Sequence, residues 1–229
     1  CKNKWCNGHN VYPPQHYGYS DDFPQWHTQD LEAMVRFGRN HPSVILWSIG
    51  NEIDYPNDPY VHPAFATLAG NNDANKPDEA LRYDPNRPDI SRLTVVAREM
   101  AATVHQLDPS RPVTMALAAP ALSNLVNLPE ELDVVGYNYM EERYAEDHRQ
   151  YPKRIIYGSE NHQSPEAWRA VLHNPNIAGQ FLWTGADFLG EARGWPVRVS
   201  TAGLLDTANH EKPLYCLRKA LWTEPIYAK

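Results

Sequence analysis

The chain has 229 residues, with 21 basic and 28 acidic side chains and a formal net charge of −7 at pH 7. Its hydrophobic content of 42% and charged content of 21% are typical of a folded domain with one sizeable core. No apolar run approaches the roughly 20 residues that a membrane-spanning helix needs. The chain also lacks the basic surplus that favours phosphate backbones. We therefore predict neither a membrane segment nor a nucleic-acid partner.

Aromatic residues are biased toward rings with a polar atom, with 13 Tyr and 7 Trp against 5 Phe. Such rings suit carbohydrate ligands, because they combine an apolar face with a hydrogen-bonding group. Cys1, Cys6 and Cys216 are too few for a disulfide framework. The sequence begins without an initiator Met, so we expect it to be cut from a longer protein. The compartment is left open between cytoplasmic, periplasmic and secreted.

Apolar runs alternate with amphipathic stretches, a pattern typical of an α/β domain with a parallel sheet. In chain order, the predicted elements are a helix over 25–39, a strand over 43–49, a helix over 90–107, strands over 112–117, 133–137 and 154–158, a helix over 165–172, a strand over 177–183 and a helix over 213–221. The first strand is continuously apolar, as expected for burial on both faces. Asp89 is predicted to cap the helix over 90–107. Residues 54–88 carry no sustained period and are predicted to form a long loop.

A closed (β/α)8 TIM barrel needs eight strands, and this pattern supplies five. Either three further strands lie in the first forty residues and the long loop, or the chain is the later part of a larger barrel. We favour the second alternative. Residues 1–229 are then a single-domain fragment of an incomplete barrel, with about strands four to eight and their helices.

Two glutamates stand at matching positions after predicted strands. Glu52 follows the strand that ends at Ile49, and Glu160 follows the strand that ends at Gly158. The ends of parallel barrel strands converge on one mouth, so these carboxylates can face each other. Glycoside hydrolysis needs such a pair, because one carboxyl protonates the leaving oxygen while the other attacks or supports the reacting carbon. We predict ordinary surface positions for three other glutamates, Glu130, Glu141 and Glu142.

Residues 41–52, HPSVILWSIGNE, resemble the acid/base signature of glycoside hydrolase family two, which holds β-galactosidases, β-glucuronidases and β-mannosidases. Further matching segments follow in the family's order: VGYNY at 135–139, YGSE at 157–160 and GQFLWTGADFLGE at 179–191. The resemblance runs from about residue 23 to residue 222. It implies that these four segments are barrel strands four, six, seven and eight of a catalytic domain. Barrel strands one to three and the β-sandwich domains ahead of them would then be absent, in agreement with the strand count.

The resemblance also implies a role for each matching residue. Glu52 would be the general acid/base, and Glu160 the nucleophile of a retaining mechanism, with the two carboxyl groups about 5–5.5 Å apart. Asn51 would bind the sugar 2-hydroxyl, and Tyr139 would donate its hydroxyl to Glu160. Trp183, followed by a cis peptide bond, would form the platform under the sugar ring. The remaining predicted substrate-binding residues are Asn138, His162, Asp187, Glu191 and Trp195.

One departure from the family pattern bears on the substrate. β-Glucuronidases carry an Asn-x-Lys motif shortly before the segment that matches residues 203–205, where this chain has Ser200-Thr201-Ala202. A uronate carboxylate would lack its usual cation, so we predict a neutral sugar, galactose first and mannose second. Arg193, Arg198 and Lys212 could supply the charge by another route, which leaves a β-glucuronidase-type specificity open.

No metal or cofactor is predicted, because no HExxH or CxxC motif occurs. Cys1, Cys6 and His9 could hold zinc only with a distant fourth ligand. The resemblance allows Mg²⁺ or Na⁺ near the site, with ligands partly in segments that this chain lacks.

The leading hypothesis is a retaining exo-β-glycosidase, β-galactosidase-like, that hydrolyses a terminal β-linked sugar of a glycoside or oligosaccharide. An alternative is a non-catalytic sugar-binding or interaction fragment whose open sheet needs a partner chain. A β-glucanase of the same barrel superfamily would share the two glutamates, but the segment at 179–191 argues against it. The oligomeric state is left open.

Overall fold

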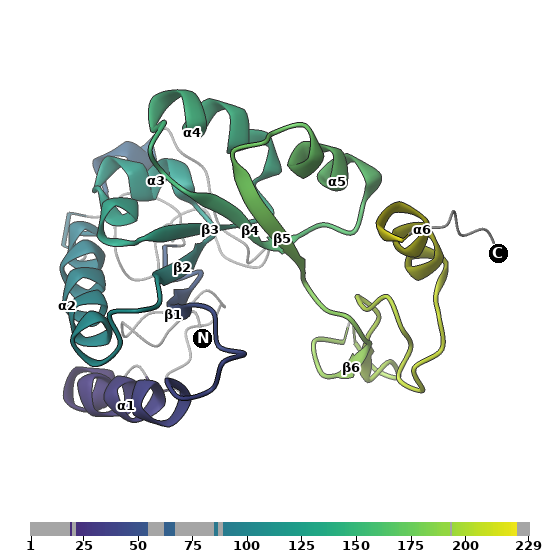
Figure 1. The fold of residues 1–229 in the computed structure, drawn as a ribbon, viewed down its shortest axis with the longest axis horizontal. Helices are drawn as coiled ribbons and strands as arrows, with labels where there is room; N and C mark the ends of the chain where they lie inside the picture. Colours follow the sequence, from purple (N-terminus) through teal and green to yellow (C-terminus); the bar gives the residue numbers. More distant parts are fainter. Residues whose placement is uncertain are drawn as a thin grey trace.

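The computed structural model describes residues 19, 22–54, 62–66, 85–86, 89–192 and 194–223. Within them, five strands form one parallel sheet in the order β1-β2-β3-β4-β5. The strands are β1 (Trp47–Asn51), β2 (Val113–Leu117), β3 (Val134–Asn138), β4 (Ile156–Asn161) and β5 (Ile177–Leu182). They follow one another along a curved arc, with helices on its outer side (Figure 1). Each strand pairs with the next strand in sequence, as in a (β/α)8 barrel.

The connections between the strands are mainly helical. The helices are α1 (Phe23–Gly38), α2 (Ser91–Leu107), α3 (Pro120–Leu125), α4 (Tyr144–Gln150), α5 (Pro165–Leu172) and α6 (Pro213–Trp222), with 3-10 helices η1 (Pro63–Ala66), η3 (Leu128–Glu131) and η4 (Glu141–Arg143). Two short strands, β6 (Phe188–Leu189) and β7 (Val199–Ser200), form a separate antiparallel pair between β5 and α6. This alternation confirms the predicted α/β class. Of the predicted loop over 54–88, residues 55–61, 67–84 and 87–88 lie outside the described part.

The long helices lie within two residues of their predicted bounds. The buried residues of α2 recur at helical spacing and include Leu93, Ala97, Met100 and Val104, as predicted. The Asp89 carboxylate accepts a hydrogen bond from the Ser91 N–H at 2.8 Å, which confirms its place at the start of α2. Helices α3 and α4 were not predicted, because six or seven residues are too few to show a helical period.

The first strand begins four residues later than predicted. The Val44 N–H donates to the His41 carbonyl at 3.1 Å, and the Val44 carbonyl accepts from the Arg111 guanidinium at 2.7 Å. Both backbone groups of Val44 are therefore used outside the strand ladder. In β1, Trp47 and Ile49 are buried while Ser48 is exposed, so burial of this strand on both faces was a wrong prediction.

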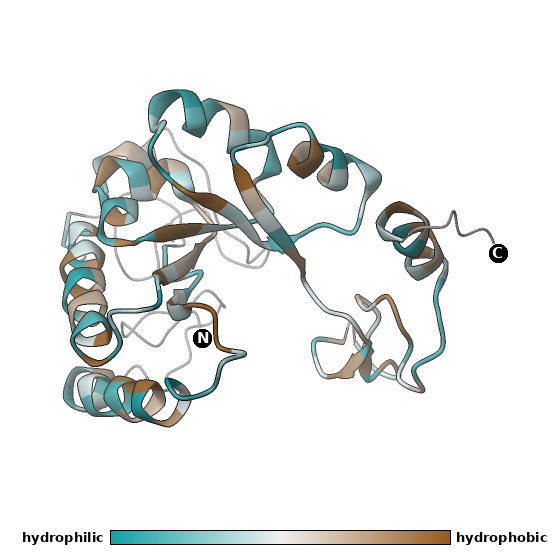
Figure 2. Ribbon diagram, in the orientation of Figure 1, coloured by the Kyte–Doolittle hydropathy of each residue, from teal (hydrophilic) through white to brown (hydrophobic). Residues whose placement is uncertain are grey.

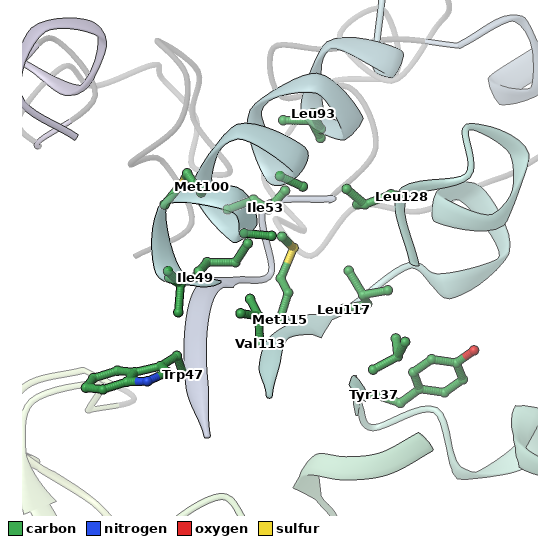
Figure 3. Packing of buried hydrophobic residues seen from close by; sticks show 14 of the residues in the cluster. Trp47, Ile49, Ile53, Leu93, Met100, Val113, Met115, Leu117, Leu128 and Tyr137 are labelled. Atoms are coloured by element: carbon green, nitrogen blue, oxygen red, sulfur yellow. The ribbon is translucent and has the colours of Figure 1, made fainter. Parts of the chain in front are cut away.

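The hydrophobic core lies between the sheet and the surrounding helices. All five residues of β2 are buried, and Val113, Met115 and Leu117 are completely so. Figure 3 shows these side chains beside Leu93 of α2, with Ile49 and Tyr137 from the flanking strands. Hydrophilic and hydrophobic residues alternate along the outer helices (Figure 2), as expected for helices with one face in water.

Asp108 ties the end of α2 to β1. Its carboxylate accepts hydrogen bonds from Ser110 Oγ at 2.5 Å, from Trp47 Nε1 at 2.9 Å and from Arg111 Nη1 at 2.6 Å. These donors favour the ionised carboxylate, so they hold the pKa of Asp108 below its ordinary value of 3.8. A depressed pKa in the folded state adds stability that is present above the unfolded pKa and is lost as the pH falls through the folded pKa.

This linkage predicts a specific acid response. We expect Asp108→Asn to be less stable than the wild type at pH 7 and to lose less of its remaining stability between about pH 5 and pH 2. Urea unfolding at a series of pH values measures both free energies of unfolding. Parallel acid slopes for the two proteins would contradict the assignment.

Gly158 permits close packing between β4 and α4. A Cβ at this position would lie 1.7 Å from Asn161 Oδ1 and 2.7 Å from Tyr144 Oη, two atoms that are hydrogen-bonded at 3.2 Å. We expect Gly158→Ala to lower the free energy of unfolding by about 1–3 kcal/mol through overpacking. Gly179 on β5 is the matched control, because a Cβ there meets nothing within 4 Å. Equal thermal stability of the two alanine variants would contradict this account.

Candidate active site

The pairing of the two strands that lead to Glu52 and Glu160 is irregular just before each glutamate. On β1, Ser48 and Asn51 pair with Thr114 and Ala116, so three steps along β1 oppose two along β2. On β4, Ser159 is the extra residue between the partners of consecutive β3 residues. Such bulges re-aim side chains and are frequent at barrel rims and beside active sites.

Glu160 lies within β4, which continues to Asn161, and not after the strand as predicted. Its register partner is Asn138, the last residue of β3. Glu52 directly follows the last residue of β1. Both glutamates therefore stand at the carboxyl-terminal edge of the parallel sheet, where the active sites of such barrels lie.

The backbone conformation marks three of the predicted site residues. Glu52, Tyr139 and Glu191 have φ angles of 52°, 56° and 45°, in the left-handed region that few residues other than glycine adopt. In the described part of the chain, Asn127 and Asn209 are the other non-glycine residues with positive φ. Left-handed backbones of this kind cost energy and cluster at functional sites.

Glu52 is almost enclosed, with 5% of its surface exposed. Its backbone N–H donates to the Ala116 carbonyl at 2.8 Å, which fixes it to the end of β2. Asn138 Nδ2 donates to Glu52 Oε1 at 3.2 Å and to Asn51 Oδ1 at 3.1 Å. Ser159 Oγ in turn donates to Asn138 Oδ1 at 2.6 Å. One hydrogen-bonded network thus links the ends of β1, β3 and β4.

Tyr139 lies next to Glu160, the predicted nucleophile. Burial raises the pKa of its hydroxyl, and the charge of Glu160 and a hydrogen bond to that carboxylate raise it further. The charges of Glu52 and Glu191 act in the same direction, so these carboxylates also lie near the phenol. The Tyr139 N–H donates to the Glu160 carbonyl at 2.7 Å. The structure therefore brings the predicted acid/base and nucleophile residues to one place, while their separation stays a prediction.

A pocket of about 510 Å³ adjoins Tyr139. It is lined by residues at the ends of β3, β4 and β5, in the 201–203 segment and at the start of α6, namely Tyr139, Asn161, His162, Gln163, Trp183, Thr201, Ala202, Gly203, Lys212, Pro213 and Leu214. Three predicted substrate-binding residues, Tyr139, His162 and Trp183, are therefore neighbours along one cavity. Trp183 is 39% exposed, as a ring available to a ligand would be.

His162 is held by Glu141. Its ring lies 4.8 Å from the Tyr139 ring, and its backbone N–H donates to Glu141 Oε1 at 3.0 Å. The Glu141 side chain is only 10% exposed, so its prediction as an ordinary surface glutamate was wrong. This contact forms between η4 and the end of β4, which are adjacent only in the folded chain. Glu130 and Glu142 are exposed, as predicted.

Asp187 and Lys212 form an ion pair beside the pocket. Lys212 Nζ lies 2.8 Å from Asp187 Oδ1 and also 2.8 Å from the Thr201 carbonyl oxygen. Asp187 Oδ1 accepts the Gly203 N–H at 2.8 Å as well. The predicted sugar-binding carboxylate thus anchors the 201–203 segment, a contact across 16 to 25 positions that no local pattern signals.

Two other expectations concern the loop after β5. Trp195 is 79% exposed, lies outside the pocket lining and has the Arg198 guanidinium 4.6 Å from its ring centroid. The peptide bond after Trp183 is trans, so the expected cis bond was wrong. Among the described residues, the cis bond is Trp195–Pro196.

The described residues contain no group of His, Cys, Asp or Glu arranged to hold a metal ion. Cys1, Cys6, His9 and Arg193 lie outside the described part, while Cys216 is a free thiol. Across the part of the chain that the structure describes, none of the helices combines the length and apolar character needed to cross a membrane.

Comparison with known sequences adds a family and relatives. The family model described as glycosyl hydrolases family 2, TIM barrel domain, matches residues 6–166. Beta-galactosidase BoGH2A of Bacteroides ovatus is 28% identical over an alignment that covers 91% of this chain and 30% of that protein. Beta-glucuronidase of Felis catus is 24% identical over 89% of this chain and 32% of its own length. The chain therefore spans less than a third of these relatives.

Solved structures agree in fold. A glycosyl hydrolase family 2 member from Bacteroides cellulosilyticus superposes with a TM-score of 0.69 at 29% identity, covering 94% of this chain and 26% of that one. A beta-glucuronidase from Bacteroides uniformis superposes with a TM-score of 0.64 at 20% identity, covering 94% of this chain and 27% of that one, a likeness of fold alone. Because the family model matches well over half of the sequence, the chain belongs to glycosyl hydrolases family 2, within its TIM barrel domain.

Proposed function

We propose that the protein carrying this chain is a retaining exo-β-glycosidase, β-galactosidase-like, with Glu52 as acid/base and Glu160 as nucleophile. The observation that supports this most directly is the position of both glutamates around the end of β3, where Asn138 donates to Glu52 Oε1 and is the register partner of Glu160. A phenol that donates to Glu160 keeps that carboxylate in one orientation, while the nearly enclosed Glu52 is held from a different strand. Membership of the family and relatives named as β-galactosidase and β-glucuronidase point to the same chemistry.

The reaction has two balanced steps. In the first, a Glu160 oxygen bonds to the anomeric carbon, the glycosidic C–O bond breaks, and Glu52 gives its proton to the departing oxygen. In the second, Glu52 takes a proton from water, whose oxygen bonds to the anomeric carbon as the bond to Glu160 breaks. Two inversions retain the β configuration, and both residues return to their starting states.

The charge balance beside the pocket supports a neutral sugar. Among the residues that line the pocket, Lys212 carries a positive charge, and His162 carries one only when its ring is protonated. Asp187 already pairs with Lys212 at 2.8 Å, so a uronate carboxylate would have to compete for it. We therefore place β-galactosides first and β-mannosides second. β-Glucuronides are the alternative to these neutral sugars, because the relatives include a β-glucuronidase.

Hydrolysis of p-nitrophenyl glycosides by the full-length protein tests the proposal. We expect turnover of the β-galactoside or the β-mannoside and release of the β-anomer in the first seconds, as seen by NMR. Faster turnover of the β-glucuronide would reverse the specificity and leave the mechanism intact. Release of the α-anomer, or no turnover of any of the three β-glycosides, would contradict the proposed function.

A further inference from the structure

Both polar atoms of Asn138 are hydrogen-bonded to protein atoms and buried. The residue is 1% exposed. Its two amide N–H groups serve Glu52 Oε1 and Asn51 Oδ1, and its carbonyl oxygen accepts the Ser159 hydroxyl. A primary amide offers two donors and one acceptor oxygen, and here both kinds of group are engaged by protein atoms. Because the side chain is buried and both its polar atoms bond to protein atoms, it acts through its neighbours and not by touching the sugar.

We propose that Asn138 and Ser159 are positioning residues that aim the carboxyl group of Glu52 at the leaving-group oxygen. This inference rests on the proposed function. Asn138 faces two acceptors, Glu52 Oε1 and Asn51 Oδ1, so its NH₂ group must turn toward them. Its oxygen then points to β4, where Ser159 donates to it at 2.6 Å. Hydrogen bonds therefore hold the Asn138 amide at both its nitrogen and its oxygen. The group that donates to Glu52 cannot rotate freely.

The local backbone is shaped for this contact. Ser159 is the extra residue of the β4 bulge, which frees its side chain from the regular alternation of the strand. On the neighbouring strand stands Gly136, where a Cβ would lie 2.6 Å from Ser159 Oγ and 2.7 Å from Ser159 Cβ. A side chain at position 136 would therefore push the hydroxyl away. The bulge and the glycine together make room for Ser159 directly beside the nucleophile.

Positioning of a general acid has a signature that a loss of stability lacks. Protonation matters for a poor leaving group such as phenolate, and hardly for 2,4-dinitrophenolate, which departs without a proton. A misdirected Glu52 should therefore slow hydrolysis of the phenyl glycoside and spare the dinitrophenyl glycoside in the glycosylation step. A general disturbance of the fold would slow both.

The experiment compares kcat/KM for phenyl and 2,4-dinitrophenyl glycosides of the sugar that the full-length wild type hydrolyses. We expect Ser159→Ala to lower the phenyl value about tenfold and Asn138→Leu about 100-fold, with the dinitrophenyl value within about threefold of wild type in each. Thr94→Val is the matched control, because it removes another buried hydroxyl bond, from Thr94 Oγ1 to the Val126 carbonyl at 2.9 Å. We expect no change in the substrate ratio for this variant.

The possible outcomes separate this inference from the proposed function. An active wild type whose Ser159→Ala variant keeps the wild-type ratio of the two substrates would overturn the positioning role alone. A wild type inactive on every aryl β-glycoside would overturn the function and the inference together. If Asn138→Leu does not fold, Ser159→Ala decides the question, since it deletes one oxygen and adds no atom.

Discussion

Glu160→Gln is expected to lower kcat for a p-nitrophenyl β-glycoside by about 10⁴-fold or more, a loss typical of removing a catalytic nucleophile. The amide cannot supply the negatively charged oxygen that bonds to the anomeric carbon. Its size is unchanged, and its carbonyl oxygen can still accept the hydrogen bond from Tyr139 that the carboxylate accepts. The loss therefore reports the missing nucleophile and not a collapsed pocket.

External azide provides the specific test of that assignment. Because azide can occupy the space that a truncated carboxylate leaves on the face opposite the leaving group, Glu160→Ala should form an α-glycosyl azide, detectable by NMR. Glu146→Gln is the control, since this glutamate lies on α4 with a side chain that is 56% exposed. Turnover by Glu160→Gln near the wild-type rate would remove Glu160 from the mechanism.

The sheet was predictable because its strands are short apolar runs between amphipathic helices. Residues 112–117 and 177–183 become β2 and β5 with shifts of at most one residue at either end. The start of β1 was not predictable, because it depends on Arg111 reaching the Val44 carbonyl across 67 positions. The short helices α3 and α4 gave no periodic signal. They are too short to be stable alone, and tertiary packing stabilises them.

In the site, too, residues within a local motif could be predicted, and contacts between distant positions could not. Glu52 and Glu160 could be proposed as the catalytic pair from the residues around them, because each stands near a strand end within a specific motif. The bulge at Ser159 could not, because it exists only in the register between β3 and β4. Glu141 and Lys212 likewise find their partners 21 and 25 positions away. Their roles as supports of the pocket emerge only when the chain is folded.

Glu52→Gln is expected to lower kcat/KM by an amount that depends on the leaving group of the substrate. For phenyl β-glycosides, kcat/KM should fall about 10²- to 10⁴-fold, because the departing phenolate no longer receives a proton. For 2,4-dinitrophenyl β-glycosides, kcat/KM should stay within about tenfold of wild type, since that leaving group needs no acid. The amide introduced at position 52 would still offer a carbonyl oxygen to Asn138 Nδ2, so the network at the strand ends is retained.

The same variant should complete the first step of the reaction and be slow in the second, hydrolysis of the glycosyl-enzyme. Without a base to activate water, the glycosyl-enzyme formed from the dinitrophenyl substrate accumulates, giving a burst of one dinitrophenolate per site and a covalent mass increase of one sugar. Azide should then release a β-glycosyl azide, of opposite configuration to the product from Glu160→Ala, because here it attacks the glycosyl-enzyme and not the substrate. Equal losses on both substrates without a burst, or an α-azide, would show that Glu52 is not the acid/base.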